Sequence, residues 1–273
     1  MSEIKELAFR KGVSKPHFYK IEYFGRTSYL LGTYHWGVSM DEFPAEVRER
    51  AEAAEKLIVE LKPTAYDLQQ SERCESNMDD CLIRLNRNAA GRKMRKKYRE
   101  ALYPFLSEYA LKRMKSYLDL DSAYLAWPAL ITEGGSMEMD LIRSAHNNGQ
   151  DIIGLETIRE RLNNIDRAIF NGQTRLRNTK LIDLAKDVYN GDLSWYEDKA
   201  QSLSDYRAGK IETEYLDMLS MTYRNEAWLS RLLEELKTSE TYIAVGYLHL
   251  YGNKGLLKLL RERNLRIERV DFE

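Results

Sequence analysis

Short apolar segments of strand length, separated by helical patterns, constrain the fold of this chain more than any other feature. Residues 57–61 (Leu-Ile-Val-Glu-Leu), 151–156 and 241–249 are nearly continuous apolar runs. Strands that are buried on both faces, as in parallel sheets, have this pattern. The helical pattern of residues 45–55 precedes the first of these runs, and a helix is the usual connection between parallel strands. The sequence therefore predicts an α/β fold.

The remaining segments complete a mixed sheet. Residues 18–24 and 27–34, on either side of a turn at Gly25-Arg26, predict a hairpin, and residues 266–272 predict a last strand. Dense charge and helical spacing predict a helical insert over about residues 71–131. No hinge rich in Gly, Pro or Ser divides the chain. We therefore expect a mixed, largely parallel central sheet flanked by helices, with the helical insert, in a single domain over residues 1–273.

Composition and charge restrict the class of protein. The 42 Lys and Arg residues nearly balance the 43 Asp and Glu residues, so nothing attracts the chain globally to nucleic acid or to an anionic membrane. No stretch approaches the roughly 18 apolar residues of a membrane span, and the first residues lack the apolar core of a secretory signal. We therefore expect a cytoplasmic protein without a membrane segment. The basic run Arg92–Arg99 is expected to be a solvated helix face.

Two of the four histidines lie in matching motifs, Gly32-Thr33-Tyr34-His35 and Gly246-Tyr247-Leu248-His249. Each motif comes at the end of a predicted strand, and ligands of open α/β sheets bind beyond the carboxyl ends of strands. A glycine there permits a positive φ or a close approach of the backbone. His35 and His249 are therefore expected to converge, either as metal ligands or with one of them as a general base. His17 and His146 lie among polar residues and are expected at the surface.

Carboxylates end two of the other predicted strands, Glu60 after Leu-Ile-Val and Glu156 after Ile-Ile-Gly-Leu. A charge that follows such a run is costly to bury without a partner, so it is expected at the mouth of the sheet. Two histidines and one carboxylate form a plausible metal-binding set with an open position for water. The other carboxylate is then expected to orient a ligand or to act as an acid or base.

With these residues assembled, the chain resembles the TraB/GumN/Tiki family, whose fold is related to that of the erythromycin-esterase and ChaN-like proteins. The matching blocks are YLLGTYHWG, FPAEVRERAEAAEKLIVEL, MEMDLIRSAHNNGQDIIGLETIRERL, YRNEAWLSRLLEEL and TYIAVGYLHLYGNKGLLKLLRERNLRIERV. They are long, they occur in the order of the family, and they include both Gly-x-x-His motifs. The family turn that corresponds to Ser136-Met137-Glu138 differs in this chain, and residues 71–131 match no block.

The resemblance implies a function and a set of site residues. Members of the Tiki branch look like divalent-metal-dependent proteases, and TraB-like members are associated with the shutdown of peptide pheromone signals. By motif, the metal ligands would be His35, Glu60 and His249, holding Mn or Co, with Zn as a further candidate. Arg224 and Asn225 match the Arg-Asn helix motif of the family, and Glu156 matches its Leu-Glu-Thr segment. We therefore expect a metal-dependent hydrolase of a peptide or protein substrate.

Two alternatives to the metal-dependent hydrolase stay open at this point. The catalytic set of Glu60, Glu156, Arg224 and Asn225 also suits an esterase-like hydrolase in which a histidine activates water without a metal. The same fold also suits a non-catalytic protein that sequesters a peptide or a cofactor, because fold does not settle function. Within either hydrolase, Arg224 is expected to clamp a carboxylate or to stabilise an oxyanion.

Overall fold

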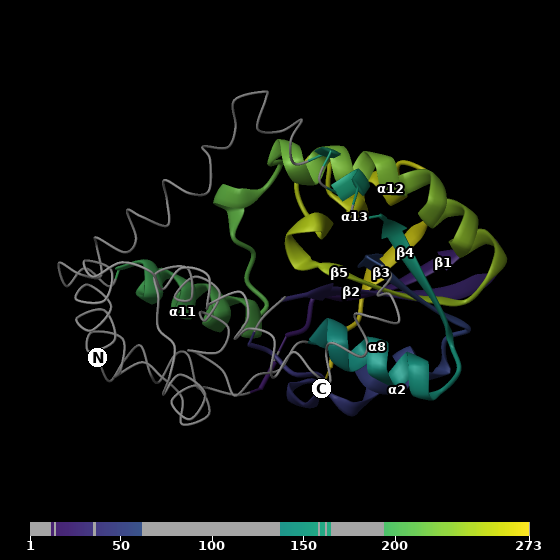
Figure 1. Cartoon of the computed structure of the whole chain (residues 1–273), viewed down its shortest axis with the longest axis horizontal. Coiled ribbons are helices and arrows are strands. Elements are labelled where there is room, and N and C mark those ends of the chain that lie inside the picture. The colour runs from purple at the N-terminus through teal and green to yellow at the C-terminus, as the bar shows by residue number, and fades with distance from the viewer. Residues whose placement is uncertain are drawn as a thin grey trace, which may run out of the picture. The chain divides into compact units, whose positions relative to one another are not determined.

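The computed structural model describes residues 12–13, 15–34, 37–61, 137–157, 159–161, 163–164 and 194–272 of the chain (Figure 1). The chain divides into two compact units. The first comprises Met1–Arg10, Pro63–Gly134 and Arg175–Ser204, of which only residues 194–204 are described. The second comprises Lys11–Lys62, Gly135–Thr174 and Asp205–Glu273 and contains the sheet. The predicted helical insert and the basic run lie outside the described residues, so the single-domain organisation stays a prediction.

The second unit is built on a six-stranded sheet with the order β4-β3-β5-β2-β1-β6. The strands are β1 (Phe18–Tyr23), β2 (Arg26–Thr33), β3 (Lys56–Leu61), β4 (Asp151–Glu156), β5 (Thr241–Gly246) and β6 (Arg266–Arg269). β4, β3, β5 and β2 are parallel neighbours, whereas β1 pairs antiparallel with both β2 and β6. The prediction of a mixed, largely parallel sheet in an α/β fold is confirmed. The parallel strands all end at the same edge, which is where ligands of such sheets bind.

Helices cover both faces of this sheet. The described helices and 3-10 turns are η1 (Met40–Glu42), α2 (Ala45–Ala53), α8 (Met137–Asn147), α11 (Ser194–Arg207), η3 (Thr213–Tyr215), α12 (Leu219–Thr238), η4 (Tyr247–Leu250) and α13 (Leu256–Arg261). α12 and α13 lie on one face of the sheet, and α2 and α8 lie on the other (Figure 1). Because both faces are covered, β3 and β5 are buried along nearly their whole length, as their continuous apolar sequences predict.

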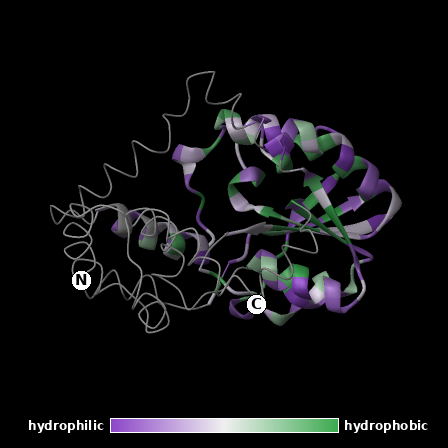
Figure 2. Cartoon of the chain, viewed as in Figure 1, coloured by the Kyte–Doolittle hydropathy of each residue, from purple (hydrophilic) through white to green (hydrophobic). Residues whose placement is uncertain are grey.

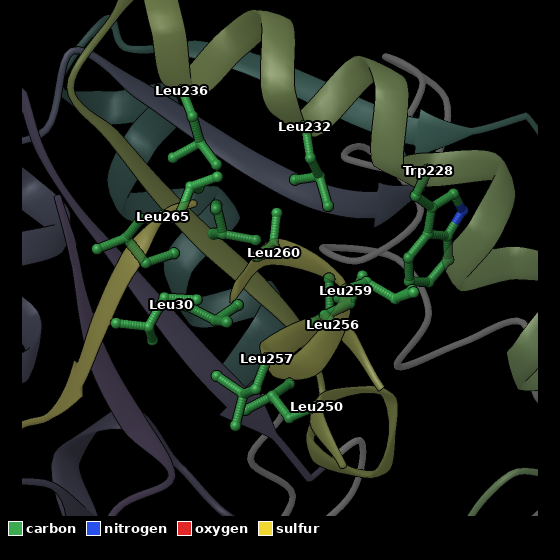
Figure 3. Close-up of a cluster of buried hydrophobic side chains, with 14 of the residues drawn as sticks. Leu30, Trp228, Leu232, Leu236, Leu250, Leu256, Leu257, Leu259, Leu260 and Leu265 are labelled. Carbon is green, nitrogen blue, oxygen red and sulfur yellow. The ribbon is translucent and has the colours of Figure 1, made fainter. Parts of the chain in front are cut away.

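The core between α12 and the sheet is made mainly of leucines. Trp228, Leu232 and Leu236 follow one another at intervals of four residues and are almost fully buried, which is the spacing of one helix face. Figure 3 shows them pointing from α12 toward the leucines of α13 and Leu265. Burying one such side chain contributes about 1.5–3 kcal/mol. Figure 2 shows the hydrophobic residues concentrated along the central strands, with hydrophilic residues over the outer parts of the helices.

Two element boundaries differ from the sequence prediction. The hairpin turns at Phe24-Gly25 rather than Gly25-Arg26, and both residues have positive φ, 48° and 74°; this two-residue turn matches the twist of the strands it joins. The apolar run 241–249 is not one strand, because β5 ends at Gly246 and residues 247–250 form η4. Pairing with β2 stops at Gly246, whose N–H donates instead to a carboxylate of Glu60.

The surface position predicted for His17 is wrong. Its side chain is 0% exposed, and its ring lies 5.1–5.5 Å from those of Tyr206, Tyr247 and Tyr251. Nδ1 lies 2.5 Å from the hydroxyl of Tyr251, which in turn lies 2.9 Å from that of Tyr19. The residues that bury His17 are about 190 to 235 positions away, so its polar sequence neighbours do not report its environment. His146 is exposed, as expected.

Candidate functional site

The carboxylates of Glu60 and Glu156 lie next to each other at the carboxyl ends of β3 and β4. Leu61 pairs with Glu156 in the parallel register, so the two glutamates come from neighbouring strand ends. Only 4% of Glu60 and 5% of Glu156 is exposed. The sequence analysis placed both at the mouth of the sheet but left their burial open. Two buried carboxylates this close require a compensating charge.

α12 supplies that charge from the polar end of its buried face. Arg224 and Asn225 are buried and precede Trp228 by one helical turn, so they lie on the face that packs on the sheet. Toward the C-terminus the same face becomes apolar. The change from polar to apolar along one helix face places Arg224 and Asn225 over the strand ends and the leucines over the middle of the sheet.

The guanidinium of Arg224 lies between both carboxylates and a histidine. Its Nε donates to Glu156 Oε1 at 2.9 Å and Oε2 at 3.2 Å, and its Nη2 donates to Glu156 Oε1 at 2.6 Å. Nη2 also donates to Oε2 of Glu60. Nη1 lies 2.9 Å from Nε2 of His249. One planar guanidinium therefore connects side chains from β3, β4 and η4, which its fixed fork of donors suits.

The environment of Arg224 keeps it charged. Burial by itself lowers the pKa of the guanidinium, but the charge of Glu60 and the hydrogen bonds to Glu156 outweigh this effect and raise the pKa. Trp228 contacts both members of the Arg224–Glu156 ion pair. Its ring lies 4.7 Å from Cζ of Arg224, and its Nε1 donates to Glu156 Oε2 at 3.2 Å. Arg161, which is partly exposed, approaches Glu60 Oε2 at 3.8 Å.

The side-chain amide of Asn225 determines which nitrogen of the His249 imidazole carries the hydrogen. Its Nδ2 donates to the backbone carbonyls of His249 at 3.0 Å and Lys254 at 2.7 Å. Oδ1 therefore faces Nδ1 of His249, at 2.6 Å. An amide oxygen only accepts, so Nδ1 carries the hydrogen of the neutral ring and Nε2 keeps its lone pair. In this structure that lone pair accepts from Nη1 of Arg224.

The two Gly-x-x-His motifs contact each other. A Cβ on Gly32 would lie 2.8 Å from Cβ of Tyr247, the residue after Gly246, and 3.0 Å from Cβ of His17. Neither motif glycine has a positive φ. The sequence analysis expected these glycines to allow either a positive φ or a close approach of the backbone, and Gly32 allows the close approach. Gly246 contributes its backbone N–H, which donates to Glu60 Oε1 at 2.8 Å.

Replacing Gly32 with alanine is expected to destabilise the protein by about 1–3 kcal/mol, the usual cost of overpacking a tight core. The added methyl group would push Tyr247 and with it η4, which carries His249. Urea denaturation of Gly32→Ala measures this loss. Glu49→Ala is the control for an alanine that meets no packed neighbour, because Glu49 is exposed on α2, and it should change the stability by less than about 0.5 kcal/mol. A Gly32→Ala loss no larger than that of the control would contradict the close packing.

α8 binds both the first histidine motif and the chain that follows it. Thr33 donates to Glu138 at 2.7 Å, and Asp140 accepts from the side chain of Ser39 and the backbone of Met40, both at 3.2 Å. Glu138 lies in the first turn of α8, in the segment where this chain departs from the family pattern, and sequence reasoning gave it no role. His35 itself lies outside the described residues, so its convergence on His249 stays a prediction.

The structure brings together five of the six residues predicted to be catalytic or metal-binding, and we call Glu60, Glu156, Arg224, Asn225 and His249 the strand-end cluster. Trp228, which contacts Arg224, Glu156 and His249, was missed by the sequence analysis. Its position one helical turn after Arg224 is the signal that could have found it.

The donor set expected for a metal ion does not fit an ion as the described residues are arranged. No group of three His, Cys, Asp or Glu side chains in the described part of the chain could hold one. In addition, Nε2 of His249 and Oε2 of Glu60 both accept from Arg224. His35, the third expected ligand, lies outside the described residues.

Fold and site together define an α/β protein with a buried carboxylate, guanidinium and imidazole cluster at the ends of its parallel strands. The model of the TraB/PrgY/gumN family matches residues 17–269, so the chain belongs to this family. The resemblance predicted from the sequence blocks is confirmed. No curated protein and no solved structure matches the chain significantly. Among the described residues, no helix is long and apolar enough to cross a membrane.

Proposed function

We propose that this protein is a hydrolase that cleaves a peptide at the strand-end cluster. The observation that carries the proposal is the histidine whose tautomer is fixed: Asn225 binds Nδ1–H of His249 and leaves Nε2 as the basic nitrogen. A histidine held in this way serves as a general base and then as a general acid. The peptide nature of the substrate comes from the family resemblance.

In the proposed reaction, Nε2 of His249 takes a proton from water while the water oxygen attacks the carbonyl carbon of the peptide. The imidazolium then returns this proton to the leaving amine as the C–N bond breaks. The base acts only when its lone pair is not engaged, so Nη1 of Arg224 must transfer its hydrogen bond from His249 to the substrate. The carbonyl oxygen, which gains negative charge, is the natural acceptor.

Arg224 is equipped for this transfer. It has five N–H hydrogens, and the second hydrogen on Nη1 makes no hydrogen bond within the described residues. Nε and Nη2 stay bound to Glu156 and Glu60, so the carboxylates hold the guanidinium while Nη1 changes partner. In this proposal Glu60 and Glu156 position Arg224, and Asn225 positions His249. The sequence predicts that Glu60 or Glu156 transfers protons; in this proposal His249 transfers them instead.

A divalent ion, Mn or Co, bound by His35, Glu60 and His249, is the competing form of the same proposal. The family resemblance supports it, whereas the positive charge of the Arg224 guanidinium beside Nε2 of His249 favours the form without a metal. No step described above passes through an ion.

The proposal is tested by incubating the purified chain with a peptide library, in chelator and separately with added Mn²⁺ or Co²⁺. We expect cleavage in chelator, and we expect His249→Ala to lower kcat by at least about 100-fold, the usual minimum for a general base. His146→Ala is the matched control, because His146 is exposed on α8, and it should cleave like the wild type.

The other outcomes separate the alternatives. Cleavage that requires added Mn²⁺ or Co²⁺ would support the competing form with a metal. Peptide binding without cleavage under any condition, retained in His249→Ala, would replace the hydrolase with a sequestering protein. Equal kcat values for His249→Ala and the wild type would remove His249 from the reaction.

A further inference from the structure

Acceptor atoms of Glu60, Glu156 and His249 surround one cation, the guanidinium of Arg224. Nη2 of Arg224 binds both Glu60 Oε2 and Glu156 Oε1, and Nη1 lies 2.9 Å from His249 Nε2. Glu60 Oε1 lies 3.8 Å from the same Nε2. Two carboxylates and one imidazole therefore surround the end of a single guanidinium. Carboxylate oxygen and imidazole nitrogen are also the atoms that bind borderline divalent metal ions.

We infer that Arg224 is the resident cation of this site and that its guanidinium and a divalent metal ion exclude each other at His249, Glu60 and Glu156. The imidazole nitrogen has one lone pair in the plane of its ring. Nδ1 is committed to Asn225 and Nε2 to Arg224, so the ring has no nitrogen to offer an ion while the guanidinium stays in place.

The charges of the site, like its geometry, indicate that a metal ion and the Arg224 guanidinium exclude each other. Glu60 and Glu156 carry two negative charges, and Arg224, with the more distant Arg161, balances them. A divalent ion added to this balanced set would face a buried guanidinium at contact distance, where the repulsion is weakly screened. Without Arg224, the same ion would meet two carboxylates that have lost the guanidinium they share.

Removing the guanidinium is therefore expected to turn the cluster into a metal-binding site. Methionine keeps the length and apolar body of the arginine stem without its charge. In calorimetric titrations with Mn²⁺, Arg224→Met should bind the ion at least about 100-fold more tightly than the wild type does. The ion should also raise the thermal midpoint of this variant, because it binds the folded state only. The double variant Arg224→Met/His249→Gln should lose most of the gain.

Arg231→Met is the matched control, because Arg231 lies on the same helix and is exposed. Its affinity for Mn²⁺ should equal that of the wild type. The inference is overturned if Arg224→Met binds Mn²⁺ no more tightly than the wild type, or if the gain persists when His249 is replaced.

A measurement on the unchanged protein covers the case in which Arg224→Met does not fold. The chain has four histidines, so ¹⁵N-labelled imidazoles can be followed one by one during titration with Zn²⁺. We expect the Nε2 signal of His249 to stay in place. A Zn²⁺-induced shift of that signal would overturn the inference. Because both tests measure metal binding rather than cleavage, they can fail independently of the proposed function.

Discussion

Glu156→Ala is expected to lower the free energy of unfolding by about 3–5 kcal/mol, the loss that follows when one partner of a buried ion pair is removed. Glu156 accepts from both Nε and Nη2 of Arg224 and from the indole of Trp228. Without it, three N–H groups lose their acceptor in a place that water hardly reaches. Urea denaturation at neutral pH measures the loss.

Glu46→Ala is the matched control, because Glu46 also pairs with an arginine, Arg50, but both side chains are nearly half exposed. That pair should contribute less than about 1 kcal/mol. Glu156→Gln, which keeps one acceptor oxygen, should fall between the two. If Glu156→Ala costs no more than Glu46→Ala, Glu156 does not hold the guanidinium as the structure indicates.

Much of the strand-end cluster was predictable because parallel strands end at one edge. The continuous apolar runs located β3 and β4 and predicted Glu60 and Glu156 at the mouth of the sheet, and the pairing of β3 with β4 places them side by side. The Arg-Asn pair came from the family motif, and helix periodicity explains why it faces the sheet. What the sequence could not supply is the direction of each hydrogen bond. That Arg224 binds both glutamates and the histidine at once follows from the tertiary structure alone.

The glycine motifs show a similar limit. Their repetition indicated a shared role, and both do lie at strand ends. Gly32, however, is required by a contact with Tyr247 of the other motif, and Gly246 uses its backbone N–H toward Glu60. Local spacing identifies the residues, but two segments more than 200 positions apart must meet before their separate roles can be seen.

His17 is expected to make the protein sensitive to acid. Burial, followed by the charge of Arg269, lowers the pKa of its imidazole to about 3, and the carbonyl of Lys210 offsets only part of this effect. Nε2 makes no hydrogen bond within the described residues, so a proton there would gain only the partial compensation that the Lys210 carbonyl gives. In the unfolded chain the pKa returns to about 6.5. Between these two values the unfolded state binds the proton and the folded state does not.

The contribution of the neutral His17 to the free energy of unfolding is therefore complete above about pH 6.5 and is lost as the pH falls toward 3. At pH 5 the loss amounts to about 2 kcal/mol. His17→Gln does not titrate, so the stability of the wild type relative to this variant should decline by that amount between pH 7 and pH 5. Urea denaturation at both pH values measures the decline, and the carboxylates common to both proteins cancel.

His146→Gln is the control for this experiment, because it makes the same substitution at an exposed histidine. Relative to the wild type, its stability should not change between the two pH values. A His17→Gln variant that follows the wild type from pH 7 to pH 5 would mean that the ring accepts its proton without unfolding. The surrounding Tyr206, Tyr247 and Tyr251 would then have to open to water. Since Tyr247 belongs to the second histidine motif, such an opening would disturb the position of His249 as well.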